Sequence, residues 1–230
     1  MSSVFRYIST LLLCLLLPLQ TIAQSGEVIA RVLQTAGSVA AIDPDNNTRE
    51  LLRRSEVHLG DTVVTGPQGF IQIRMLDGAM LALKENSEFL FEEFDYDGNP
   101  NTRDSVVMNL LQGGFRTISG SIGDSTDDTY RVDTSFASIG VRGTTHEGVI
   151  SFGSLFTGVS NGGTTVTNEF GSLDTGLGGD YDYAVTTQGQ PPQGLLQQPG
   201  QLGQINLNPG AGDEEDDEGG GDDENADDQN

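Results

Sequence analysis

Apolar and polar residues alternate along much of this chain, and this alternation limits its possible folds more than any other feature. In residues 28–32 and 71–75 every second residue is apolar. A period of two is typical of half-buried β-strands, because successive side chains of a strand point to opposite faces of a sheet. Turn residues separate the apolar runs, and no ten-residue helical pattern competes with them. The fold class is therefore all-β, either a sandwich or a β-solenoid.

The clearest local unit is a hairpin centred on Asp77 and Gly78. These two residues stand between the apolar runs of the stretch "IQIRMLDGAMLALK". An Asp-Gly pair in this position favours a tight turn with a positive φ at its centre, which glycine adopts without strain. The sequence predicts two antiparallel strands joined at this pair.

The first 23 residues have the pattern of a secretory signal. Arg6 supplies a basic start, residues 11–19 form an apolar core, and residues 21–23 end in small side chains. We expect cleavage after Ala23 and a periplasmic or secreted protein. The apolar run is shorter than the ~20 residues that a membrane-spanning helix needs, so no membrane span is expected after signal cleavage.

Composition narrows the chemistry that is available to the mature chain. The single cysteine, Cys14, lies in the signal core, so the mature chain has no disulfide, thiolate metal site or cysteine nucleophile. The chain has only two histidines, His58 and His146, so metal and acid-base chemistry is poorly supplied, and no cofactor is implied. The formal net charge of −23 argues against nucleic acid and anionic lipid as partners.

The composition changes near residue 190. Residues 191–212 are rich in Gln, Pro and Gly and are typical of an extended linker. Eleven of the last eighteen residues are acidic, and such a segment cannot bury a core, so we expect a disordered acidic tail. The expected organisation is a signal peptide over 1–23, a β domain over 25–190, and linker plus tail over 191–230.

Several separated motifs occur in one order. The stretches "LGDTVVTGPQGFIQIRMLDGAMLALKENSEFLFEEF", "MNLLQGGFRTISG" and "YRVDTSFASIGVRGTTHEGV" together resemble the FecR domain family, with a core match over residues 57–150. The motif residues are Gly60, Asp61, Val63, Thr65, Asp77, Gly78, Leu110, Gly113, Gly114, Thr134, Ala137, Ile139, Arg142, Gly143 and Thr144.

This resemblance implies an extracytoplasmic β module. The best-known members of the family also carry a cytoplasmic anti-sigma segment and a membrane helix, and this sequence shows neither. Ser135 and His146 stand where the family often has a proline and an aromatic residue. A role in sigma-factor signalling by the chain itself therefore does not follow from the resemblance.

Arg142 lies in the run "FASIGVRGTTHEGV" and is the last basic residue of the chain. A cation among apolar residues is costly to bury without a partner, so this position suggests a structural slot. In a strand, Arg142 shares a face with small residues, which leaves room for its stem. Its expected partners are backbone carbonyls or the carboxylate of Asp61 or Asp77; ligand binding is the alternative.

The loop "DYDGNPNTRD" is a candidate calcium site. It places Asp95, Asp97, Asn99 and Asp104 close together, and oxygen atoms at alternate positions are what calcium loops use. However, Pro100 replaces the glycine of an EF-hand and no glutamate stands at position twelve. A solvated hairpin loop is the competing interpretation.

Two further patterns suggest hydrolysis. Asp174, Thr175 and Gly176 form the tripeptide of aspartic proteases, but no second such triplet exists to share a proton. His146 and Glu147 are adjacent, and neighbouring residues of a strand point to opposite faces. A turn at residue 174 and an unreactive histidine are the competing interpretations.

These observations favour a binding function without catalysis. The predicted protein is a FecR-like binding or sensing module of the cell envelope, whose strand edges and loops contact a protein, a peptide or a polymer. The alternatives are a calcium-dependent structural or adhesive envelope protein and a hydrolase that uses Asp174 or His146.

Overall fold

Strands make up most of the computed structural model, which describes residues 26–99, 103–124 and 129–207. The expected signal peptide and the acidic tail lie outside these residues. The strands are β1 (Val28–Ala36), β2 (Val39–Ile42), β3 (Thr48–Glu50), β4 (Glu56–His58), β5 (Thr62–Thr65), β6 (Phe70–Met75), β7 (Met80–Leu83), β8 (Glu88–Asp95), β9 (Ser105–Gln112), β10 (Gly114–Ile118), β11 (Thr129–Thr134), β12 (Ser138–Ser151), β13 (Ser154–Asn168), β14 (Gly171–Gly176), β15 (Tyr183–Thr187) and β16 (Gln193–Leu195), and a short helix, α2, spans Ser121–Asp124.

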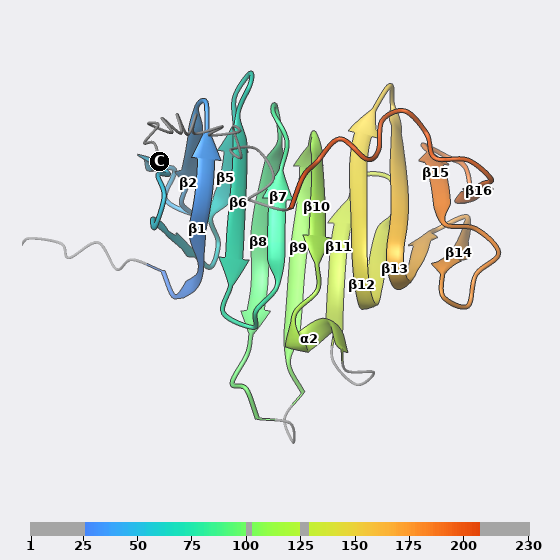
Figure 1. The fold of residues 1–230 in the computed structure, drawn as a ribbon, viewed down its shortest axis with the longest axis horizontal. Coiled ribbons are helices and arrows are strands. Elements are labelled where there is room, and N and C mark those ends of the chain that lie inside the picture. Colours follow the sequence, from blue (N-terminus) through green and yellow to red (C-terminus); the bar gives the residue numbers. More distant parts are fainter. Residues whose placement is uncertain (1–25, 100–102, 125–128, 208–230) are drawn as a thin grey trace, which may run out of the picture.

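The described strands pair into one sheet that curls back on itself (Figure 1). Its order runs β3-β2-β5-β8-β9-β11-β12-β10-β7-β6-β1-β4. The first half of β12 pairs with β11 and the second half with β10, so this strand joins two layers. We call the layer of β1, β6, β7 and β10 the front layer, and that of β2, β5, β8, β9 and β11 the back layer.

The core lies between the two layers. Phe89 and Phe91 enter it from β8, and Phe115 enters from β10. The ring of Phe89 lies 5.5 Å from each of the other two rings, and all three side chains are fully buried. The all-β prediction is confirmed: a single sheet of the described strands curls around this core.

The predicted hairpin at Asp77 and Gly78 is present. The N–H of Gly78 donates to the carbonyl of Met75 at 3.1 Å, and Gly78 has a φ of 91°. The strands β6 and β7 on either side pair antiparallel. The positive φ at the turn is the reason that glycine is needed there.

A β-bulge interrupts β12 at Gly143. The pairing of β12 with β13 shifts between Arg142 and Thr145, and Gly143 has a φ of 55°. A bulge adds one residue to one strand, which changes the face that later side chains use. Ile139 therefore points into the core before the bulge, and His146 points into it afterwards.

The chain remains packed beyond residue 190, which differs from the expected extended linker. The strand β16 pairs with β15. Leu202 and Ile205 are only 4% and 5% exposed. Within the described residues, no helix has the length and apolar content of a membrane span.

Candidate functional site

Residues 196–207 form a strap across the outer face of the front layer (Figure 1). The strap leaves β16 and returns over β13 and β12 toward β10. The N–H of Gly203 donates to both carboxylate oxygens of Glu147 on β12, at 3.0 Å each. The amide of Gln72 on β6 donates to the carbonyl of Leu207 at 2.7 Å. The strap therefore crosses the strands instead of extending the sheet.

One row of outward-facing residues includes the sheet positions that contact the strap. Cross-strand pairing places these residues side by side from β15 to β6: Tyr183, Gly158, Glu147, Arg116, Ala82 and Gln72. A side chain at Gly158 would collide with Leu202 of the strap. The absence of a side chain at Gly158 thus gives Leu202 a place to pack.

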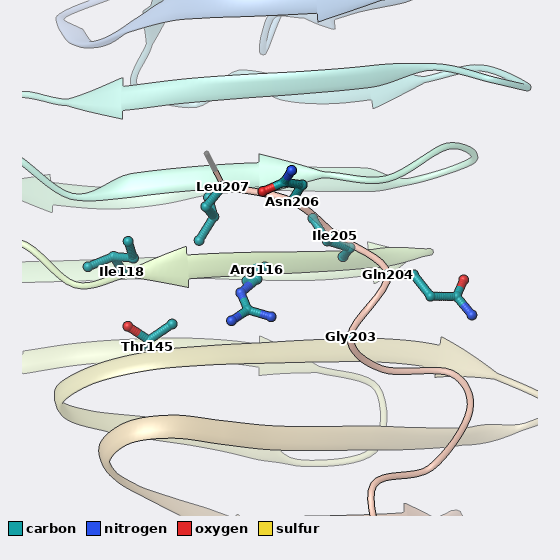
Figure 2. A pocket seen from close by; sticks show the side chains of 8 residues that line it. All are labelled: Arg116, Ile118, Thr145, Gly203, Gln204, Ile205, Asn206 and Leu207. Carbon is teal, nitrogen blue, oxygen red and sulfur yellow. The ribbon is translucent and has the colours of Figure 1, made fainter. Parts of the chain in front are cut away.

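A groove lies between the strap and the sheet (Figure 2). Its volume is about 550 Å³. The sheet supplies three of its lining residues and the strap supplies the others: Arg116, Ile118, Thr145, Gly203, Gln204, Ile205, Asn206 and Leu207. The groove is open to solvent, since Ile118 on β10 is 43% exposed.

Arg116 is the charged side chain of this groove. Its Nη2 lies 3.3 Å from the hydroxyl of Ser160, and its Nη1 lies 3.9 Å from Oε2 of Glu147. These contacts use at most two of the five N–H donors of a guanidinium. Glu147 is buried and accepts the backbone N–H of Gly203, which fixes its carboxylate below the strap. The groove thus combines spare cationic donors with the apolar side chains of Ile118 and Ile205.

The sequence alone does not indicate this groove. Its strap falls in a segment whose composition, dominated by Gln, Gly and Pro, predicts a linker. A usable signal was present in "LGQINL", where Leu202, Ile205 and Leu207 recur within six residues. Apolar residues in an otherwise polar segment indicate that part of it is buried.

The two acids of the FecR-like motif, Asp61 and Asp77, have separate local roles. Asp61 is buried, and its carboxylate accepts the N–H of His58 and both terminal nitrogens of Arg49. Asp77 is also buried, and burial raises its pKa. One oxygen of Asp77 accepts the N–H of Ala79 at 3.0 Å, which closes the turn.

The motif glycines stand where the backbone has a positive φ. Gly60 and Gly113 have φ values of 85° and 79°, a region that residues with a Cβ adopt at a cost. A Cβ at Gly113 would also overlap the backbone of Asn86 and Ser87. These positions support the fold, and none of them lines the groove.

The expected buried pairing of Arg142 is wrong. Its side chain is 57% exposed on the outer face, and its Nη2 lies 3.5 Å from Oδ1 of Asp174. The carboxylate of Asp61 is taken by Arg49, and Asp77 lies in the β6–β7 turn. The physical requirement in this motif is the bulge at Gly143, beside which Arg142 turns outward and Thr144 turns inward.

The acid-rich loop after β8 does not gather its carboxylates into a metal cluster in the described part of the chain. There, no group of three or more His, Cys, Asp or Glu side chains is placed to hold a metal. The Oδ1 of Asp97 accepts the N–H of Asn99 at 2.7 Å, a local turn bond. Asp104 is buried at the start of β9, and Asp95 ends β8.

The candidate hydrolytic residues lie in three different surroundings. His146 is buried against the rings of Phe115 and Tyr130, and burial lowers its pKa to about 3. Glu147 faces the strap on the other side of the sheet. Asp174 lies on the exposed face of β14, where it accepts the hydroxyl of Thr165 at 2.5 Å. The structure brings none of these into one site.

The fold defines this chain as an all-β sheet module with a strap-covered groove. The model of the family described as FecR protein matches residues 61–163, so this part of the chain is a FecR domain. FecR domains are typical of signalling and sensing proteins and are typically extracytoplasmic. Comparison with curated proteins gave no match.

Several solved structures are similar to part of this chain. One, described as a cell surface anchoring domain, is 27% identical, with a TM-score of 0.27, over 27% of this chain and 83% of its own. Two crystal structures of an anti-sigma factor from Parabacteroides distasonis ATCC 8503 are 13% and 10% identical, each with a TM-score of 0.45. Each match covers 57% of this chain and 57% of the anti-sigma factor.

Proposed function

We propose that this chain is an extracytoplasmic binding or sensing module of the cell envelope that acts without catalysis. The observation that carries the proposal is the groove at Arg116, which a strap of the same chain forms on a FecR domain. A rigid sheet with a groove is a platform on which a partner docks, because its side chains are already in place.

The partner class follows from the groove lining. The spare donors of Arg116 bind a carboxylate or another anionic group, and the half-exposed Ile118 packs beside it. A peptide, protein segment or polymer of the envelope that carries an anionic group next to an apolar one fits this lining. The binding energy comes from the guanidinium pair and from the apolar area that the partner covers.

A photo-crosslinking amino acid at position 118 tests this function in producing cells. We expect a discrete adduct in the envelope fraction, and we expect Arg116→Met to reduce its yield because the anionic group loses its partner. The control carries the same crosslinker at Leu111, which is 52% exposed on β9 and lies outside the groove. Identical adducts at both positions, or no adduct at position 118, would contradict a binding role of the groove.

A further inference from the structure

The strap points toward the edge of the front layer. It ends at Leu207, whose carbonyl accepts the side-chain amide of Gln72 on β6, and the strand next to β6 is β1, where Gln34 pairs with Gln72. Beyond β1 lies the turn of residues 52–55, whose Arg54 N–H donates to the carbonyl of Val32. A chain that continues along the line of the strap thus passes over β1 toward this turn.

Four arginines lie on this route, and we call them the arginine face: Arg31, Arg53, Arg54 and Arg74. All four are exposed. Arg31 forms an exposed pair with Glu56 at 2.7 Å. Among the described residues, the side chains of the other three have no hydrogen bond or ion pair.

The pairing of β1 with β6 places two of these arginines directly opposite each other. Arg31 and Arg74 are direct cross-strand neighbours on the same face. Like charges at directly opposed positions destabilise a sheet, and an anion that lies over both relieves the repulsion. The arrangement therefore favours a bound polyanion.

The acidic end of the same chain is within reach. Asp213 is the first of six consecutive acids and follows Leu207 by six residues. Six extended residues span about 20 Å, whereas neighbouring strands are only about 4.8 Å apart. Residues 213–218 therefore reach β1 and the turn at 52–55 without strain.

We propose that the acidic segment 213–218 docks on the arginine face of its own chain. The short connection to Leu207 gives the segment a high effective concentration at the face. A free polyanion has no such advantage, and the net charge of −23 repels it. The tail is thus the resident occupant of this surface, and an outside anion binds there only by displacing it.

Paramagnetic broadening in the full chain tests the docking. A nitroxide is attached at Gly220→Cys in a Cys14→Ser background, and the backbone amides are observed at about 20 mM salt. We expect at least a twofold loss of intensity at the arginine face. The loss should disappear in about 0.5 M salt, where screening acts over a few ångströms. It should also disappear when Arg53, Arg54 and Arg74 are all changed to Glu.

The matched control changes Arg131 and Arg142 to Glu. Both are exposed arginines that lie away from this face, on β11 and β12, so broadening at the arginine face should persist. Uniform broadening, or broadening centred on residues 131 and 142, would overturn the proposal. Broadening in a mixture of spin-labelled chains and separate isotope-labelled chains would assign the contact to a second copy and would also overturn it.

Polyglutamate supplies an independent measurement. We expect it to bind a chain that ends at Leu207 at least fivefold more tightly than the full chain, because the resident segment has been removed. Equal affinity for the two chains would show that the tail does not occupy the face. Neither measurement depends on Arg116 or the groove, so their failure is distinguishable from failure of the proposed binding function.

Discussion

Arg49 and Asp61 form a two-pronged ion pair at the start of β5. The Nη1 of Arg49 lies 2.8 Å from Oδ1 of Asp61, and Nη2 contacts Oδ2. Asp61 is 1% exposed, and hydrogen bonding to it raises the pKa of Arg49. This pair connects β3, which carries Arg49, to β5. The pair therefore holds β3 in place next to β5. The motif at Gly60 and Asp61 does not reveal this contact in the sequence.

Replacing Arg49 with Met should lower the free energy of unfolding by about 3 kcal/mol. The change leaves the buried carboxylate of Asp61 with the N–H of His58 but without its cation. Urea denaturation at pH 7 measures the loss. The control is Arg31→Met, because Arg31 and Glu56 are both exposed and such pairs contribute about 0–1 kcal/mol. Equal losses in the two variants would contradict the structural role of Asp61.

Two motif glycines with similar backbone angles should respond differently to alanine. Gly78 and Gly113 have φ values of 91° and 79°, so both substitutions carry a conformational cost of about 1 kcal/mol. A Cβ at Gly78 meets open space, but at Gly113 it overlaps the backbone of Asn86. We expect Gly113→Ala to cost about 2 kcal/mol more than Gly78→Ala. Similar melting temperatures for the two variants would refute this steric argument.

His146 should make the stability depend on pH. The folded chain holds its pKa at about 3, below the ordinary value of 6.5, so only the unfolded chain gains a proton as the pH falls. The free energy of unfolding should decrease by about 1.4 kcal/mol per pH unit from about pH 6.5 toward pH 3. Comparing the parent chain with His146→Phe at pH 7.0, 5.5 and 4.5 isolates this contribution. A difference between the two proteins that stays constant over this range would exclude it.

Much of the fold was predictable because it depends on local patterns. The period of two identified strands such as β6, and the Asp-Gly pair identified the turn after it. The pairing of distant strands was not predictable, since β12 contacts both layers through a bulge. Gly143 is visible in the sequence, but only the register shows that the bulge there turns Thr144 and His146 inward.

The candidate site was less predictable, for a physical reason. The groove depends on Arg116 of β10 and on a strap that arrives from about ninety residues later in the chain. Sequence composition describes neighbours along the chain, whereas this site joins residues through sheet pairing and side-chain packing. Arg142 is conspicuous in the sequence because it is the last basic residue of the chain. Arg116 has no such feature, yet Arg116 is the arginine that lies in the groove.

Arg142 should contribute little to stability. Its partner Asp174 is about as exposed as Arg142 itself, and exposed pairs at 3.5 Å are weak. We expect Arg142→Ala to change the free energy of unfolding by less than about 0.5 kcal/mol, measured by urea denaturation. The neighbouring change Gly143→Val should cost at least about 2 kcal/mol, because a β-branched residue is strained at a φ of 55°. A large loss in Arg142→Ala would restore the buried structural role that the sequence suggested.

Two truncations test the strap. In about 0.5 M salt, which screens the tail from the arginine face, a chain that ends at Leu207 should unfold cooperatively with the stability of the full chain. A chain that ends at Gln190 should lose about 2–4 kcal/mol, because Leu202 and Ile205 no longer cover the front layer. The matched point variants are Leu202→Ala, which should be destabilising, and Leu196→Ala, which should be neutral because Leu196 is 88% exposed. Equal unfolding midpoints for the two truncated chains would show that the folded domain ends at residue 190.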